Sequence, residues 1–202
     1  MPVIVSRNPR RTDMNSLIES PRAAFVALAL SIALMTPLTV RAESAAPEKD
    51  AAKLTDARIA AIVLAANTID VENGNLAIAK SKTSSVRDFA KQMIRDHTSV
   101  NEKAAALAAR LNVVPEKSPA SLSLVATAET TRDKMRKLSG AAFDRAYVNN
   151  EVSYHQAVID LLDQTLVPGA ENKDLKALLV NVRPAFVAHL EHAKMIQRTL
   201  IK

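Results

Sequence analysis

The stretch that decides the fold is Phe89–Leu111, FAKQMIRDHTSVNEKAAALAARL. Six apolar residues and one histidine recur there at steps of 4, 4, 3, 4, 3 and 4 residues: Phe89, Met93, His97, Val100, Ala104, Leu107 and Leu111. This spacing follows the 3.6-residue turn of an α-helix and places the seven side chains on one face. Ser85, with Asp88 three residues later, predicts a capping-box-like start, and Asn112 and Pro115 predict the end. The stretch is therefore predicted to be a long amphipathic helix.

Three further long helices and a shorter one are predicted around it. The first begins with Thr55 as N-cap and runs to about Ser81, with an apolar face of Ile59, Ile62, Val63, Ala66, Ile69 and Leu76. The shorter helix covers about Leu124–Leu138 and ends at Ser139-Gly140. The third long helix carries the stripe Phe143, Tyr147, Glu151, His155, Val158 and Leu162, and stops at Pro168-Gly169. The fourth runs from about Asn172 to the end, with Leu175, Leu179, Val182, Phe186, His189, Ala193 and Ile196 on one face.

These elements predict an all-α fold. Two helical hairpins with short turns, joined by a long connection that contains its own helix, are typical of a four-helix bundle with a crossover. The bundle is predicted to occupy residues 55–202. Gly74 lies inside the first helix, where it costs about 1 kcal/mol relative to alanine, so we expect a neighbouring helix to cross closely there. Pro184 is expected to kink the fourth helix, because it removes a backbone donor.

Residues 1–42 are predicted to be a cleaved signal peptide. Arg7, Arg10, Arg11 and Arg22 form a basic region, an apolar run follows over residues 23–40, and Val40-Arg41-Ala42 provides small residues for cleavage after Ala42. Residues 43–54 read as a polar, flexible lead-in. We therefore expect a periplasmic or otherwise exported protein. A retained membrane anchor is the alternative, because the run is about long enough to cross a bilayer.

The composition excludes several kinds of function. Removing residues 1–42 leaves 22 Lys+Arg against 19 Asp+Glu, a net charge of +3, so most of the case for nucleic-acid binding disappears. The chain contains no cysteine, which excludes disulfides and thiolate metal sites. It contains only three glycines and no G-x-S-x-G, phosphate-binding loop or H-E-x-x-H motif. Glu-x-x-His, which ferritin-type di-iron sites require, is also absent, so we expect no enzymatic activity; an oxidase-like enzyme is the alternative.

Three of the four histidines lie on the apolar stripes of three different helices: His97, His155 and His189. Counting residues from the turns places Glu72 of the first helix at the depth of His97. We therefore predict a metal site inside the bundle, formed by Glu72, His97, His155 and His189 and supported by Met93, Asp96, Glu151 and His192. Imidazole and carboxylate ligands together suit Zn, Cu, Fe or Ni.

Two considerations oppose a single shared site. Counted from Pro168-Gly169, His189 and His155 are mismatched in depth by about 8 Å, unless the Pro184 kink and the loop absorb the difference. His192 follows His189 by three residues, and such a pair could bind metal without the other helices. The plainer interpretation is that each histidine is buried and hydrogen-bonded, with Asp96 serving His97 and Glu151 serving His155.

Several blocks of the sequence resemble the bacterial family called domain of unknown function 4142: Asp70-Val71-Glu72-x-Gly74, Phe89-Ala90-x-x-Met93-x-x-Asp96-His97-Thr98, Leu138-Ser139-Gly140-x-x-Phe143-Asp144-x-x-Tyr147, and Pro184 with His189-Leu190. The resemblance implies a ferritin-like helical bundle, export, and no established activity. It also implies that Glu72, His97, His155 and His189 occupy the family's acidic and histidine positions. The chain departs from the family pattern at Tyr154, where an aspartate is usual, and at Asn73, where an apolar residue is usual.

Two functional hypotheses follow. The first is a non-enzymatic bundle that binds a transition-metal ion or small ligand, in stress or metal handling. The second is a metal-free envelope interaction or stress module, whose outer helix faces contact a partner protein or the membrane surface.

Overall fold

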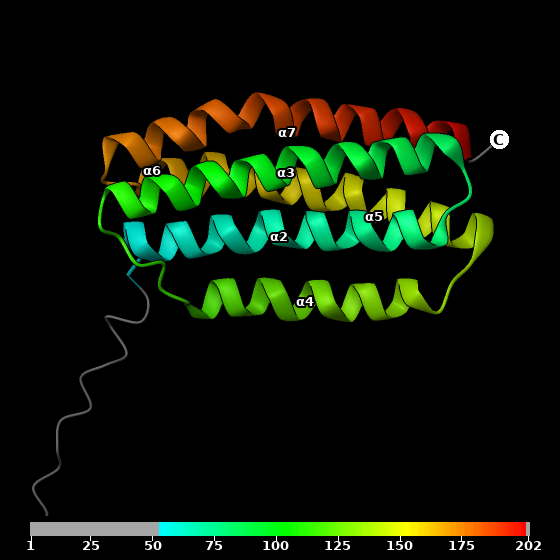
Figure 1. The fold of residues 1–202 in the computed structure, drawn as a ribbon, viewed down its shortest axis with the longest axis horizontal. Coiled ribbons are helices and arrows are strands. Elements are labelled where there is room, and N and C mark those ends of the chain that lie inside the picture. Colours follow the sequence, from blue (N-terminus) through cyan, green and yellow to red (C-terminus); the bar gives the residue numbers. More distant parts are fainter. Residues whose placement is uncertain (1–52, 201–202) are drawn as a thin grey trace, which may run out of the picture. The chain divides into compact units, whose positions relative to one another are not determined.

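The computed structural model describes residues 53–200; the predicted signal peptide and most of the predicted lead-in lie outside this range. Within it, the chain forms α2 (Asp56–Lys80), α3 (Ser84–Arg110), α4 (Pro119–Arg136), α5 (Gly140–Leu161), the π-helical segment η1 (Leu162–Leu166), α6 (Val167–Gly169) and α7 (Lys173–Leu200), as Figure 1 shows. No strand occurs among these residues. The predicted all-α class is therefore confirmed.

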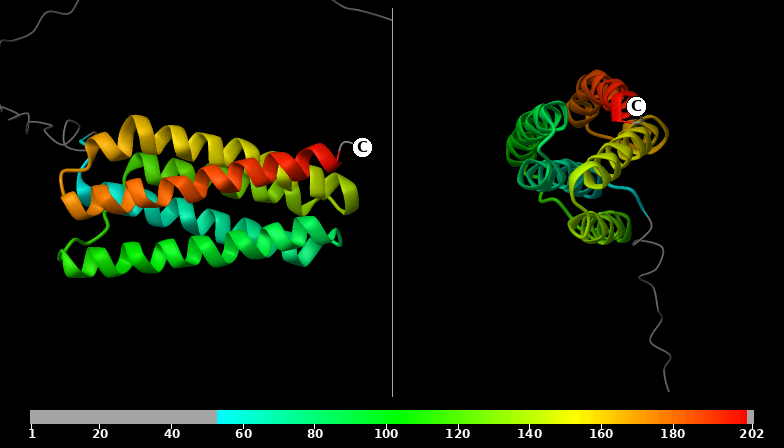
Figure 2. Two further views of the ribbon diagram at one scale, coloured as in Figure 1. Left: turned by 90° about the horizontal axis from the view of Figure 1, so that it is seen from above. Right: turned by 90° about the vertical axis from the view of Figure 1, so that its right-hand side faces the viewer.

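The four long helices α2, α3, α5 and α7 form the bundle. In the end-on view of Figure 2 they surround a common core, while α4 lies outside it. Helix α4 belongs to the connection between α3 and α5, and it contacts α2 and α5. The predicted crossover with its own helix is thus present. None of the helices in the described range is long and apolar enough to cross a membrane.

Of the starts of α2, α3 and α4, the first agrees with the sequence and the other two differ. Thr55 caps α2, its hydroxyl accepting a hydrogen bond from the backbone of Arg58 at 3.3 Å. The predicted capping box at Ser85 is wrong, because α3 begins at Ser84 and its N-cap is Thr83, two residues before Ser85; the hydroxyl of Thr83 donates to Asp144 at 2.5 Å. Helix α4 begins at Pro119 rather than near residue 124, because Ser118 and Ser121 form a capping box of their own.

The predicted close crossing at Gly74 is confirmed. A Cβ atom on this residue would lie 2.8 Å from Cγ1 of Ile94 and 3.0 Å from the backbone oxygen of Ala90, both on α3. Glycine therefore lets α2 and α3 approach at this point.

The turn between α5 and α7 lies slightly later than the sequence predicted. The chain stays helical through η1 and α6 to Gly169, so the turn consists of residues 170–172. The carboxylate of Asp56 accepts hydrogen bonds from the backbone amides of Glu171 and Asn172, both at 2.9 Å, and so ties this turn to the start of α2. Asn172 in turn caps α7 by accepting from the amides of Asp174 and Leu175.

The core consists of two apolar clusters with a polar layer between them. The first cluster includes Ile59, Val63, Val100, Ala104, Val158, Leu162, Leu179 and Phe186. The second includes Ala77, Val86, Phe89, Met93, Phe143, Tyr147, Val148 and Ile196. Between them in sequence, on all four long helices, lie buried polar residues: Asn67, Asp70, Asn73, His97, Glu151, His155 and His189. The candidate site is this polar layer.

Candidate metal centre

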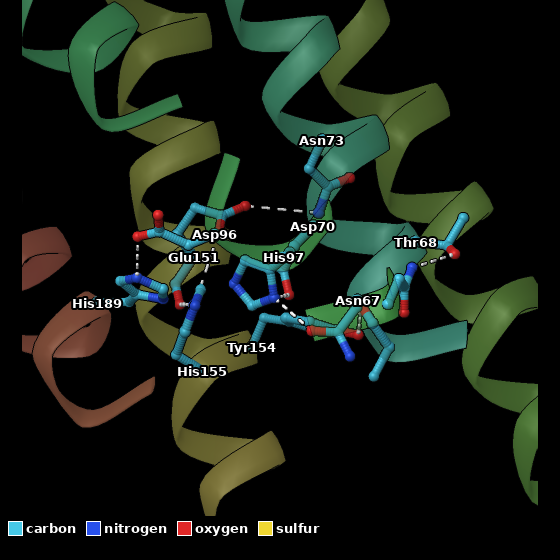
Figure 3. Close-up of polar contacts among 12 residues, drawn as sticks. Asn67, Thr68, Asp70, Asn73, Asp96, His97, Glu151, Tyr154, His155 and His189 are labelled. Atoms are coloured by element: carbon cyan, nitrogen blue, oxygen red, sulfur yellow. Dashed lines mark hydrogen bonds and ion pairs between the residues drawn. The ribbon is translucent and has the colours of Figure 1, made fainter. Parts of the chain in front are cut away.

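The structure brings His97, His155 and His189 together. Their ring centroids are 5.5 Å apart for His97 and His155, 5.2 Å for His97 and His189, and 5.5 Å for His155 and His189. One nitrogen of each ring lies within 4.8 Å of one nitrogen of the others. Figure 3 shows the three side chains at one place, reached from α3, α5 and α7. All three are buried.

The expected depth mismatch between His155 and His189 is wrong because the turn lies farther along the chain than Pro168-Gly169. Counted from Glu171 in the middle of the turn, His155 is 16 residues before it and His189 is 18 residues after it. Two residues correspond to about 3 Å of helix rise, which the rings themselves can span.

The tautomer of His97 is set by Asn67 on α2. The Nδ2 group of Asn67 donates to the backbone oxygen of Val63 at 2.8 Å, which turns its Oδ1 toward Nδ1 of His97 at 2.7 Å. An amide oxygen can only accept a hydrogen bond, so Nδ1 of His97 carries the proton. Asp70 lies beside the same nitrogen, with Oδ2 at 3.4 Å.

The other two histidines are held in the same way. The backbone oxygen of Glu151 accepts from Nδ1 of His155 at 3.0 Å, one helical turn away. The carboxylate of Asp96 accepts from Nε2 of His189 at 3.0 Å. Each ring therefore has one nitrogen committed as a donor, and its second nitrogen keeps a lone pair.

The second nitrogens have no hydrogen-bond partner. Nε2 of His97, Nε2 of His155 and Nδ1 of His189 are buried and unpaired. Burial, followed by the charges of the neighbouring histidines, lowers the pKa of His97 to about 2; burial also lowers the pKa of His155 to about 4 and that of His189 below its usual value. All three rings are neutral at neutral pH, which is the form that binds a metal ion.

Two buried carboxyl groups lie on the opposite side of His97 and His155. Burial raises the pKa of Asp70 well above its usual range and the pKa of Glu151 to about 7, and the two groups share a hydrogen bond. Asn73 and Asn150 each donate to Oε1 of Glu151, at 3.5 and 3.4 Å. The pair therefore keeps one proton near neutral pH, since two adjacent charges would be costly in this interior.

Glu72 is not part of the centre, and the prediction that it points inward is wrong. Its side chain is 48 % exposed and forms an ion pair with Arg132 of α4 at 2.7 Å. The buried acid of α2 is Asp70, which lies on the inner face while Glu72, two residues later, lies on the outer one.

The four supporting residues have separate positions. Glu151 is fully buried beside His155, whereas Met93 belongs to the second apolar cluster. Asp96 serves His189 rather than His97, so that interpretation is corrected. His192 faces away from the centre: its Nδ1 pairs with Gln92 at 3.1 Å and its ring lies against Phe89. His189 and His192 therefore use different partners.

The predicted site did not include Asn67, Asp70 or Asn73, although all three are buried. Asp70 and Asn73 continue the steps of 4, 3, 4, 3 and 4 residues that run from Ile59 through Val63 and Ala66 to Ala77, so the pattern was present. The two departures from the family pattern also have roles. Asn73 contacts Glu151, and Tyr154 donates to the backbone oxygen of Ala66 at 3.1 Å while its ring edge packs near His155.

Comparison with known proteins gives a fold neighbour and a family. The chain is similar in structure to CopM in the Cu(II)-bound form, with a TM-score of 0.57 and 13 % sequence identity over 73 % of this chain and 98 % of that chain. At this identity the likeness concerns the fold alone. No curated protein matches the sequence. The family model described as domain of unknown function (DUF4142) matches residues 41–196. The chain therefore belongs to the domain of unknown function 4142 family.

Proposed function

We propose that this protein is an exported, non-enzymatic bundle that binds a transition-metal ion through His97, His155 and His189 and acts in metal handling. The observation that carries the proposal is the set of three unpaired nitrogens, Nε2 of His97, Nε2 of His155 and Nδ1 of His189. Three neutral donors from three helices, each oriented by an oxygen acceptor, are the arrangement that protein metal sites use. A buried imidazole nitrogen without a partner is otherwise a net cost to the fold.

The spacing of the rings suits an ion after a small contraction. Nitrogen ligands lie about 2.0–2.1 Å from Zn²⁺, so two of them in a tetrahedral site are about 3.4 Å apart. One nitrogen of each ring lies within 4.8 Å of one nitrogen of each of the other two. Side-chain rotations that move the ring nitrogens by about 1 Å would bring them to this spacing.

Imidazole ligands suit Cu, Zn, Ni and Fe, and the three-nitrogen set alone does not choose among them. CopM, which has the same fold, was solved with Cu(II) bound, so copper is the first ion to test. The negative charge of Asp96 and of the Asp70–Glu151 pair would offset part of the charge of a divalent ion in this interior.

Titration of the metal-free protein tests the proposal. We expect one equivalent of Cu(II) or Co(II) to bind with ligand-field bands of nitrogen coordination, and His97→Ala to lose them. His192→Ala is the matched control, because it removes a histidine of the same bundle that faces Gln92 instead of the centre. Circular dichroism checks that each variant is folded. If the wild type binds no ion, the metal-free interaction module replaces this proposal. Equal binding by the two variants would refute the three-histidine centre.

The export part of the proposal has a separate test. Residues 1–42 have the features of a signal peptide. Fractionation of cells followed by N-terminal sequencing should find the protein in the periplasm, beginning at Glu43. A full-length chain in the cytoplasm would contradict export.

A further inference from the structure

The ring of Phe186 covers one face of the three-histidine centre. Its centroid lies 5.1 Å from that of His97, 6.3 Å from that of His155 and 6.3 Å from that of His189. Taken with the distances among the three histidine rings, these values place the phenyl ring over the triangle of imidazoles rather than beside it. Phe186 is stacked on His97, with 25° between the ring planes, and it is buried. The phenyl group therefore closes this face to water and to a fourth ligand.

On the opposite side of the centre, α3 and α7 contribute apolar side chains as well. These two helices run in opposite directions (Figure 1), so the residue one turn before His97 and the residue one turn after His189 lie on the same side. They are Met93 and Ala193, both fully buried and both in the second apolar cluster, whereas Phe186 belongs to the first. The three imidazoles are themselves only 1–2 % exposed.

The carboxyl oxygens around the centre lie beside the nitrogens that carry the protons, and not beside the unpaired ones. The contacts are Asp70 with Nδ1 of His97 at 3.4 Å, Glu151 with Nδ1 of His155 at 3.6 Å, and Asp96 with Nε2 of His189 at 3.0 Å. In each ring the unpaired nitrogen is the other one. Among the residues that the structure describes, the group of possible ligands around these nitrogens contains no fourth histidine or carboxylate. The donor set is therefore three neutral imidazole nitrogens.

We propose that Phe186 makes this centre selective for Cu(I) over Cu(II). The inference rests on the proposed function and adds the oxidation state of its ion. Cu(II) favours a tetragonal set of ligands, which three nitrogens beneath a phenyl ring do not supply. Cu(I) has a filled d shell and hence no geometric preference from its d electrons, so three ligands satisfy it. The ion is taken up already reduced, and no electron transfer by the protein is involved.

The reduction potential of the bound copper tests this selectivity, because it exceeds that of aqueous copper when Cu(I) is bound more tightly than Cu(II). We expect the metal-free protein to bind Cu(I) at least about tenfold more tightly, in competition with a chelator for each oxidation state. The potential is then at least about 59 mV above that of aqueous copper. X-ray absorption of the Cu(I) protein should show three nitrogen ligands. A fourth nitrogen or oxygen ligand, or equal affinity for the two ions, would overturn the proposal.

Phe186→Ala opens the covered face and lets water reach the ion. Its Cu(II) affinity should rise at least about tenfold and its Cu(I) affinity should change little, so the potential should fall by about 59 mV or more. Phe186→Leu keeps an apolar group over the centre and should keep most of the preference for Cu(I). Phe143→Ala is the matched control, because Phe143 is also fully buried but stacks on Tyr147.

A folded Phe186→Ala protein with the wild-type potential would overturn the role of Phe186. If circular dichroism shows that this variant does not fold, the potential and the ligand number of the wild type decide alone. Failure of the proposed function gives a different result. His97→Ala should lose Cu(I) and Cu(II) alike. A wild type that binds Cu(II) more tightly than Cu(I) would leave the three-histidine centre and refute only its selectivity, and a wild type that binds neither ion would refute both.

Discussion

Replacing Asn67 with leucine should weaken metal binding although Asn67 would not touch the ion. The side chain holds the proton on Nδ1 of His97 through a 2.7 Å contact, and its own amide is fixed by the backbone of Val63. Without that acceptor the proton can move to Nε2, which is the nitrogen needed for the ion. Loss of such an outer partner reduces metal affinity by about 10- to 100-fold, which is about 1.4–2.7 kcal/mol.

Asn67→Leu should also destabilise the metal-free protein, by about 1 kcal/mol. A buried donor left without an acceptor costs about 1–3 kcal/mol. Oδ2 of Asp70 lies 3.4 Å from the same nitrogen and offers it a second acceptor. The loss of stability is therefore expected at the lower end of that range. A substitution by leucine at an exposed position would not cost this stability, because it would leave no buried donor without an acceptor.

Copper affinity, measured by competition with a chelator, and urea unfolding in the presence of EDTA are the two assays. Asn101→Leu is the matched control, because Asn101 also makes an amide contact between α3 and α2, with Thr68 at 3.1 Å, and this contact involves no histidine. We expect the control to keep wild-type affinity. Wild-type affinity in Asn67→Leu as well would refute the reasoning, since it would show that the tautomer of His97 does not depend on Asn67.

Three further results are expected. Burial raises the pKa of Glu151 to about 7 in the folded metal-free protein, whereas the unfolded chain loses this proton near pH 4.5. The stability that this group contributes is therefore full below pH 4.5 and is lost as the pH rises through 7. Glu151→Gln should gain stability relative to the wild type over that interval, by up to about 3 kcal/mol in urea unfolding. Gly74→Ala should lower the free energy of unfolding by about 1 kcal/mol, because the clash with α3 exceeds the gain in helix propensity; a rise in melting temperature would contradict the close crossing. Glu72→Gln should bind copper as the wild type does in calorimetry, since Glu72 pairs with Arg132 outside the centre.

The fold was predictable because its signals are local and repeated. The period of the helix alone predicts the stripe from Phe89 to Leu111. Gly74, which has no side chain, indicates that a neighbouring helix crosses closely there. The start of α3 was harder to predict because a distant residue takes part in it. Thr83 caps α3 with its hydroxyl engaged by Asp144 of α5, and no sequence window around α3 contains that partner.

The candidate site was predictable in its histidines and not in its carboxylates. A histidine on an apolar stripe stands out against its neighbours, and His97, His155 and His189 are all buried as that contrast suggests. Glu72 was placed by its depth along the helix, which says nothing about the direction of a side chain around the helix. Depth and direction are independent coordinates, and a difference of two residues turns a helical side chain by about 200°.

Direction can nevertheless be obtained from the sequence if the stripe is followed through its polar members. From Ile59 the inner face of α2 steps to Val63, Ala66, Asp70, Asn73 and Ala77. An aspartate at such a position cannot stay charged and unpaired in the core, so it must bind a proton, a cation or a donor. In this bundle the same reasoning applies to Glu151, which faces Asp70 from α5. Two acids that meet in this way share a single proton near neutral pH, because a second negative charge beside the first would be costly in this interior.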